Sequence, residues 1–275
     1  MSARAKRSRL DDLLVDRGFF AMRDEAARAC FAGDVTSPAM PLNAPSQMVP
    51  ADIELHVRTL PRFVSRGGEK LAGALEDTGL SVAGLRCIDA GASTGGFTDC
   101  LLQAGAASVC AVDVGYGQFD FGLRNDPRVT LFERTNIRKT GAAELGGPFD
   151  LLVADLSFIS LGSLLPVLHG LIREGGRMLV LVKPQFEADR ASVGEGGIVG
   201  SAQVHESVLA QVVDEMVAEG LFVEHLVVSR ITGRKSGNIE FFACARDSAS
   251  APGVDGSIDI ASTVTSAHRE QGETA

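Results

Sequence analysis

The segment that most restricts the fold of this chain is the glycine-rich run CIDAGASTGGFT at residues 87–98. It opens with apolar residues that predict the end of a buried strand, and from Phe97 onwards apolar side chains recur with helical spacing. The run therefore predicts a strand, a glycine turn and a helix. Such a turn lets a ligand approach the backbone closely, and the start of the helix offers free N–H groups.

Acidic residues at two strand ends narrow the type of ligand. Asp89 lies just before the glycines, and Asp113 ends the next apolar run, where this architecture binds a ribose. The glycines follow the form D-x-G-x-x-x-G, not the dinucleotide form G-x-G-x-x-G, which favours a site for S-adenosylmethionine (SAM). The alternative is a glycine turn of an ordinary α/β protein. The candidate cofactor-binding residues here are Asp89, Gly91, Ser93, Thr94, Gly95, Gly96 and Asp113.

The chain around this turn alternates between predicted strands and helices. Helices such as 163–171 and 203–219 separate the first six strands, so we expect an α/β fold with a parallel, doubly wound sheet. The segment GRKSG at 233–237 joins the last two strands without a helix, so the final strand should be antiparallel, an ending typical of SAM-dependent methyltransferases. The predicted strands are residues 86–90, 108–113, 129–133, 151–155, 177–182, 222–229 and 239–245.

Charge and cysteine content limit the partners. The net charge of −9 is unevenly spread, because residues 1–68 carry slightly more Lys and Arg than Asp and Glu, which allows a polyanion to bind at this end. The five cysteines lack C-x-x-C spacing and the histidines do not cluster, so we expect neither a metal nor a disulfide framework. No apolar run is long enough to span a bilayer and no secretory signal is visible, so we expect a cytoplasmic protein without stable membrane association.

The N-terminal segment predicts a small unit of two helices and a short sheet. One helical face starts at Leu10, a second helix is expected over 23–32, and residues 53–57 alternate as a half-exposed strand. The order RLDxxLVxRG at 9–18 resembles the RNA-binding domain named after ribosomal protein S-four. That resemblance implies that basic side chains of the helices face structured RNA, whereas the alternative is a helical hairpin that only packs on the body. The arginines that match such a face are Arg7, Arg9, Arg17, Arg23 and Arg28.

Four ionisable residues are predicted at the carboxyl edge of the sheet, where open α/β folds bind ligands. Asp155 ends the fourth strand and Lys183 follows the fifth; Glu240 lies at the start of the last, and Lys70 lies on the helix before the first. This set suits methylation of a ribose hydroxyl, whose proton must pass to a basic group as the methyl arrives. A lysine can accept it when burial and neighbouring positive charge disfavour the ammonium form, while carboxylates hold the side chain. The alternative is four unrelated surface charges.

These motifs together resemble the TlyA family of hemolysin-named ribosomal RNA ribose 2′-O-methyltransferases, whose catalytic domain is similar to FtsJ. The resemblance rests on FVSRGGEKL from residue 63, GASTGGFTD from 91, ADLSFISL from 154, LVKPQFE from 181 and GNIEFF from 237. It implies SAM as cofactor and a cytidine 2′-hydroxyl in small- and large-subunit ribosomal RNA as target. It also implies that the tetrad named above is catalytic.

The expected organisation has four parts. An S-four-type RNA-binding domain covers residues 1–59, a linker 60–64, a Rossmann-like SAM-dependent methyltransferase domain 65–246, and a disordered tail without periodicity 247–275. Asn136, after the third strand, is a candidate for reading the adenine edge. The rival functions are a catalytically silent ribosome-binding factor, a membrane-active hemolysin and a small-molecule methyltransferase. Further candidates for RNA contact are Arg62, Arg66, Arg234 and Lys235.

Overall fold

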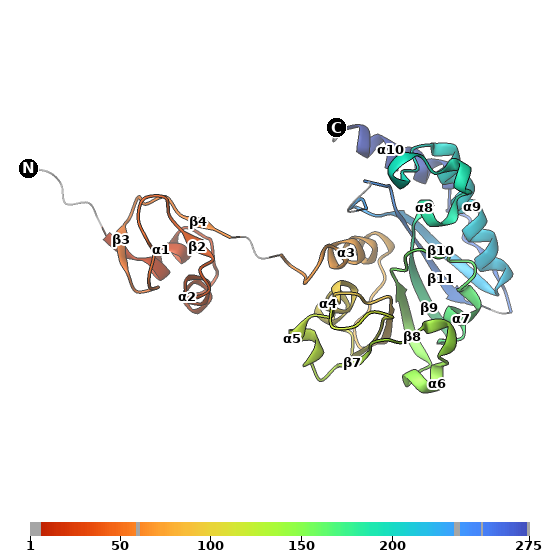
Figure 1. Ribbon diagram of the computed structural model, residues 1–275, viewed down its shortest axis with the longest axis horizontal. Helices are drawn as coiled ribbons and strands as arrows, with labels where there is room; N and C mark the ends of the chain where they lie inside the picture. Colours follow the sequence, from red (N-terminus) through yellow and green to blue (C-terminus); the bar gives the residue numbers. More distant parts are fainter. Residues whose placement is uncertain (1–6, 59–60, 234–236, 249, 274–275) are drawn as a thin grey trace, which may run out of the picture. The chain divides into compact units, whose positions relative to one another are not determined.

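An eight-stranded sheet organises the larger of two units into which the chain divides, residues 62–275; the smaller unit is residues 1–61. The computed structural model describes residues 7–58, 61–233, 237–248 and 250–273 (Figure 1). The division lies within the segment that the sequence predicts as a linker.

The large sheet has the strand order β12-β10-β11-β9-β8-β5-β6-β7. Strands β5 to β9 pair in parallel, and β6, β8 and the second half of β9 are nearly continuous apolar runs because helices cover both faces of the sheet. The strand bounds are β5 (Arg86–Ala90), β6 (Ser108–Val112), β7 (Val129–Phe132), β8 (Phe149–Ala154), β9 (Ile172–Val182), β10 (Leu221–Val228), β11 (Phe241–Asp247) and β12 (Gly253–Val254).

The predicted reversal at the end of the sheet is confirmed. Strand β11 is antiparallel to both of its neighbours, β9 and β10, with Phe241 opposite Val182 on one side and Val228 on the other. The last long strand of the sequence therefore lies between two earlier strands and inside the sheet.

Helices form a layer on each face of the sheet (Figure 1). The apolar cluster on one face includes side chains of α3, α4 and α5, and the cluster on the other includes those of α6, α7, α9 and α10. Cys87 and Cys110 are buried among these apolar side chains and act as small hydrophobic residues. The helix bounds are α3 (Arg66–Thr78), α4 (Gly96–Gln103), α5 (Phe121–Arg124), α6 (Ala142–Leu145), α7 (Leu165–His169), α8 (Pro184–Glu187), α9 (Ala202–Ala218) and α10 (Ile260–Glu273), with short 3₁₀ turns at Ile137–Lys139, Arg190–Ser192 and Glu195–Gly197.

The prediction of a disordered tail over 247–275 is wrong. Strand β12 adds to the edge of the sheet beside β10, and α10 packs against α9 and β10. Val264 and Ala267 of α10 are buried in the core, so this helix is ordered by packing although its sequence is rich in small polar residues.

Within its described residues, the smaller unit has two helices and two pairs of short strands. Strand β1 pairs with β3 and β2 with β4, all antiparallel. The core between them is formed by α1 and α2 residues such as Leu10, Leu14 and Ala26. The predicted strand over 53–57 is confined to β4, because Ile53 and Leu55 fill the core without joining a ladder. The bounds are β1 (Arg7–Arg9), α1 (Leu10–Asp16), α2 (Arg23–Phe31), β2 (Val35–Thr36), β3 (Met48–Pro50) and β4 (His56–Val57).

Candidate active site

The carboxyl ends of β5, β6 and β8 open onto a pocket of about 480 Å³. A smaller hollow of about 100 Å³ adjoins it, because Gly91, Ser93 and Asp155 line both. Two other hollows, of about 410 and 420 Å³, are lined by none of the residues that the sequence predicts as catalytic, cofactor-binding or RNA-binding. The larger pocket is lined by Gly91, Ser93, Val112, Asp113, Val114, Thr135, Asn136, Ile137, Arg138, Asp155, Leu156, Ser157, Phe158, Ile159 and Leu164.

The glycine turn brings its backbone close to the neighbouring strands. Gly91 has φ +87°, and a Cβ atom at this position would lie 2.8 Å from the carbonyl oxygen of Asp155, so no other residue fits without a shift. The amide of Gly91 donates to the carbonyl oxygen of Val112 at 2.9 Å. Ser93 also has a positive φ, +49°. The turn is thus held in a conformation that leaves its inner side open to the pocket.

Asp113 connects the glycine turn to the end of β6. One carboxylate oxygen accepts a hydrogen bond from the amide of Ser93 at 2.7 Å, and the other accepts from the amide of Gly115 at 2.6 Å. Each oxygen keeps further acceptor capacity, and the side chain lines the pocket. The carboxylate is therefore fixed in direction and can accept hydrogen bonds from a ligand's hydroxyl groups.

Asp89 is fully buried beneath the turn. Its Oδ2 accepts hydrogen bonds from the Thr98 amide at 3.0 Å and the Thr98 hydroxyl at 2.7 Å, while Oδ1 has no hydrogen-bond partner among the described residues. Burial raises the pKa of Asp89 to about 7, and the carboxylates of Asp155 and Asp113 act in the same direction. The hydrogen bonds from Thr98 oppose this rise.

Asn136 reaches the same pocket from the end of β7. Its side-chain oxygen accepts from the amide of Arg138 at 3.0 Å and so caps the 3₁₀ turn that follows. The amide of Thr135 donates to the carbonyl oxygen of Asp113 at 2.9 Å, which joins this segment to the end of β6. Asn136 is exposed and lines the pocket, as its predicted role requires.

The four predicted catalytic residues form two lysine–carboxylate pairs. Lys183 is ion-paired with Asp155, and its ammonium also donates to the hydroxyl of Ser157 at 2.9 Å. Lys70 is ion-paired with Glu240, and both side chains are buried. Charges are costly to bury unless they are paired in good geometry, so each pair has to be held by the surrounding fold.

Strand register brings the two pairs to the same face of the sheet. Phe241 and Val182 lie opposite each other and both pack in the core on the α9 side. Side chains alternate along a strand, so the next residues, Glu240 and Lys183, lie opposite each other and face the α3 side. Lys70 approaches from α3 on that face.

Two phenylalanines beside Lys183 were not predicted as site residues. Phe158 lines the pocket, is 90% exposed and has φ +67°, an unusual conformation for a bulky residue. Its ring centroid lies 5.2 Å from that of Phe186, and the Lys183 ammonium lies 5.9 Å from the centre of the Phe186 ring. The signal was available in the sequence, since each aromatic residue follows a predicted catalytic residue by three positions.

Comparison with known proteins assigns the chain to a family. A family model described as FtsJ-like methyltransferase matches residues 63–247. The chain belongs to the FtsJ-like methyltransferase family. This membership confirms the Rossmann-like methyltransferase sheet that the sequence predicts.

Relatives of this FtsJ-like chain carry TlyA and hemolysin names. The 16S/23S rRNA (cytidine-2′-O)-methyltransferase TlyA of Mycobacterium tuberculosis is 45% identical over 244 residues, which are 88% of this chain and 91% of that protein. Hemolysin A of Brachyspira hyodysenteriae is 35% identical over 86% of this chain and 98% of its own length. A solved structure from Streptococcus thermophilus, also named as a hemolysin, is 39% identical, has a TM-score of 0.75 and covers 98% of this chain and 99% of that one. The predicted resemblance to the TlyA family is thereby confirmed.

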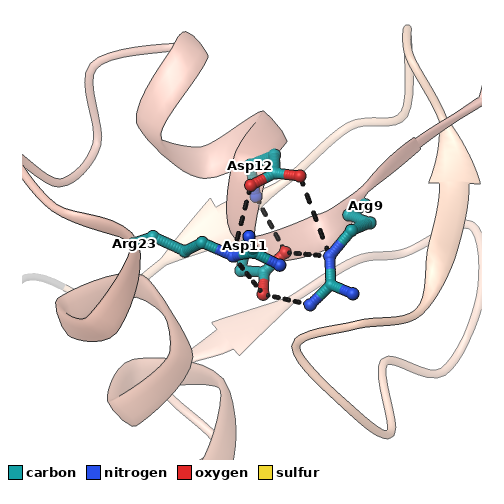
Figure 2. Close-up of polar contacts among 4 residues, drawn as sticks. All are labelled: Arg9, Asp11, Asp12 and Arg23. Carbon is teal, nitrogen blue, oxygen red and sulfur yellow. Dashed lines mark hydrogen bonds and ion pairs between the residues drawn. The ribbon is translucent and has the colours of Figure 1, made fainter.

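The arginines predicted to bind RNA in the smaller unit mostly have partners within it. Arg9 and Arg23 both contact the buried carboxylate of Asp11, at 2.8 and 3.1 Å, and both also approach Asp12 (Figure 2). Their hydrogen bonds lower the pKa of Asp11 to about 2, with Arg9 as the larger cause. Arg28 is exposed and has no ion pair among the residues that the structure describes.

The other arginines predicted to contact RNA differ in their surroundings. Arg7 and Arg17 donate to backbone carbonyl oxygens of their own unit. In the FtsJ-like unit, the guanidinium of Arg62 lies 4.7 Å from the centre of the Phe63 ring, and Arg66 donates to a carbonyl oxygen at 3.0 Å. Arg234 and Lys235 lie outside the described residues. RNA contact by all of these residues stays a prediction.

The described residues contain neither a candidate metal cluster nor a candidate membrane-spanning helix. No group of three or more His, Cys, Asp or Glu side chains within the described ranges could hold a metal ion. Among the helices of the same ranges, none combines the length and apolar character required to cross a membrane.

Proposed function

We propose that this chain is a SAM-dependent methyltransferase that modifies the ribose 2′-hydroxyl of cytidine in ribosomal RNA. The observation that carries the proposal is the two lysine–carboxylate contacts, each made by a buried lysine, at the carboxyl edge of the sheet in an FtsJ-like fold. The name of the Mycobacterium tuberculosis relative, which covers most of both chains, supports the same reaction and both ribosomal subunits as substrates.

The residues around the pocket fit SAM. The Asp113 carboxylate is oriented to accept hydrogen bonds from ribose hydroxyls, and Asn136 is available to the adenine. Gly91 lets the turn pack closely against the end of β8 at the pocket, since a Cβ atom there would lie 2.8 Å from the carbonyl oxygen of Asp155. The buried Asp89 has an oxygen without a hydrogen-bond partner among the described residues, and a cationic cofactor bound above the turn would favour the ionised form of this carboxyl group. The rest of the SAM molecule would be bound by the turn residues Ser93, Thr94, Gly95 and Gly96.

SAM supplies an electrophilic methyl group when it is bound. Lys183, as the neutral amine that is left once its ammonium has lost a proton, is the residue that we assign as acceptor of the proton from the ribose hydroxyl, because it contacts Asp155 and Ser157, which line the pocket. Asp155 holds the side chain of Lys183 in place through their ion pair. The Lys70–Glu240 pair fixes two further charges on the α3 side of the carboxyl edge of the sheet. The side chain of Lys183 is largely removed from water, so proton transfer to it would not compete with bulk solvent.

Phe158 is suited to contact the base of the target nucleotide. An exposed aromatic ring beside the catalytic lysine provides a stacking surface, and single-stranded RNA is commonly bound through such stacking. We assign affinity for the rest of the RNA to the smaller unit and to the basic residues around the pocket. That part of the affinity should fall as salt rises, because phosphate contacts release counterions.

The proposal is tested by substitution of Lys183. Lys183→Ala should reduce single-turnover methylation of ribosomal subunits by on the order of 10²–10⁴, the usual range for general acid–base catalysis, with little change in SAM affinity. Lys183→Arg should also fail, because a guanidinium does not release its proton near neutral pH. Lys139→Ala is the matched control, since Lys139 is an exposed lysine on the 3₁₀ turn that follows Asn136.

Mapping of 2′-O-methyl groups on ribosomal RNA, from cells with and without this gene, identifies the target nucleotides. Normal transfer by the alanine variant would exclude Lys183 as proton acceptor. Absence of any methyl group that depends on the gene would favour a silent ribosome-binding factor over an enzyme.

A further inference from the structure

Helix α3 contacts the segment between β10 and β11 through one of its faces. Arg66, Lys70, Gly73 and Asp77 are spaced i, i+4, i+7 and i+11, so they lie along one side of the helix. Arg66 donates to the carbonyl oxygen of Thr232 at 3.0 Å, and Lys70 is ion-paired with Glu240. The catalytic pair is thus the middle contact of a longer interface.

Arg230 forms the contact at the C-terminal end of this interface. Its guanidinium donates to both carboxylate oxygens of Asp77, at 2.5 and 3.2 Å, and to Glu76 at 2.7 Å. A planar guanidinium that bridges two carboxylates in this way fixes direction as well as distance. Gly73 makes the approach possible, because a Cβ atom there would lie 2.9 Å from Cδ of Arg230.

The Arg230 cluster is connected to the catalytic pair by a short path. The next residue toward the N-terminus, Ser229, donates its amide to the carbonyl oxygen of Glu240 at 2.8 Å. The backbone of Glu240 is therefore attached to Arg230 through one hydrogen bond and one peptide unit. On the helix side, Asp77 and Lys70 are separated by about two turns of a rigid element.

The Arg230 cluster is too exposed to matter greatly for stability. The Arg230 side chain is 51% exposed, and ion pairs of this kind contribute little to folding. The Lys70–Glu240 pair is buried and depends on close geometry. Loss of the Arg230 contacts would therefore cost little folding energy, whereas even a small change in the position of α3 relative to Glu240 would disturb the buried pair.

We infer that Arg230 is a positioning residue, which fixes α3 against the segment 229–240 and thereby sets the contact between Lys70 and Glu240. The inference rests on the proposed methyltransferase function. A displacement of about 1 Å in a catalytic group can lower a rate by on the order of 100-fold. Loss of the Arg230 contacts should therefore lower the rate of the chemical step.

The test compares Arg230→Gln with Arg173→Gln. Arg173 is a matched control, because its side chain is 52% exposed and pairs with Asp150 at 2.6 Å. This pair lies at the amino ends of β8 and β9, at the other end of the strands from the candidate site. Single-turnover methylation of ribosomal subunits at saturating SAM and RNA should fall about 10- to 100-fold for Arg230→Gln and stay unchanged for Arg173→Gln. The dissociation constants for SAM and for ribosomal subunits, and the melting temperature, should match the wild type in both variants.

The same substitution in an Asp77→Asn variant separates a positioning role of Arg230 from other roles. If Arg230 acts through Asp77, Arg230→Gln should lower the rate by a smaller factor in an Asp77→Asn background than in the wild type, because the two residues act as a unit. Equal rates for Arg230→Gln and Arg173→Gln, or independent effects of Arg230 and Asp77, would overturn the inference. So would weaker, salt-dependent RNA binding with a normal rate at saturation, since Arg230 would then be a phosphate contact. An inactive wild-type protein would instead refute the proposed function.

Discussion

Replacement of Asp89 by Asn should make the stability of this protein less dependent on pH. The native pKa of Asp89 is about 7, against an ordinary value of 3.8. A carboxyl group with a raised native pKa stabilises the fold below its unfolded pKa, and this stabilisation is lost as pH rises through the native value. Each pH unit in this window corresponds to about 1.4 kcal/mol, so the ionisation of Asp89 costs on the order of 4 kcal/mol between pH 4 and 7.

An asparagine cannot titrate, but its carbonyl oxygen can still accept the hydrogen bonds from Thr98. Urea unfolding of wild type and Asp89→Asn, measured from pH 5 to 8.5 at constant ionic strength, should give a stability difference that grows in favour of the variant and levels off above pH 7. Thr98→Val serves as an internal check, because the lost hydroxyl hydrogen bond should raise the pKa of Asp89 further and move the levelling point to higher pH. A difference that stays constant over this range would refute the reasoning, because Asp89 would then have the same charge throughout.

Three further outcomes are expected. Asp113→Ala should weaken SAM binding by about 1.5–3 kcal/mol, because bonds to a charged acceptor are lost, and calorimetry with unchanged affinity would remove Asp113 from the site. Deletion of residues 259–275 should lower the free energy of unfolding by at least about 2 kcal/mol, because Val264 leaves the core; an unchanged urea midpoint would mean that α10 contributes nothing. Asp11→Asn should reduce hydrogen-exchange protection of α1 at pH 7, and the difference should shrink as pH falls from 3.8 towards 2, because a depressed pKa stabilises only above that window.

The sheet could be predicted because its strands are buried on both faces. A run such as Leu151–Ala154 has no polar interruption. Helix α10 could not be predicted in the same way. Its core contacts are few and small, so its order depends on the surface of α9 and β10 that it covers.

The candidate site shows the same division between local pattern and long-range contact. Topology alone places Asp155, Lys183 and Glu240 at one edge, so these residues could be proposed from strand ends. Which lysine contacts which carboxylate depends on register and helix packing, and Lys70 and Glu240 are 170 residues apart. The sequence also could not indicate that Arg9 forms an ion pair with Asp11, two residues away. A sequence motif does not distinguish an arginine that is free to bind RNA from one that is paired with a carboxylate.

The position of β11 between β9 and β10 has a consequence for biosynthesis. A chain is made from its N-terminus, and strands β5 to β9 with Asp155 and Lys183 are complete before β11 has been translated. Glu240 immediately precedes β11, which lies between the two earlier strands β9 and β10, so Lys70 acquires its partner only after translation has passed residue 240. A chain translated only as far as β10 therefore lacks both Glu240 and the strand that separates β9 from β10. The topology delays assembly of the four charged residues of the candidate site until β11 has been made.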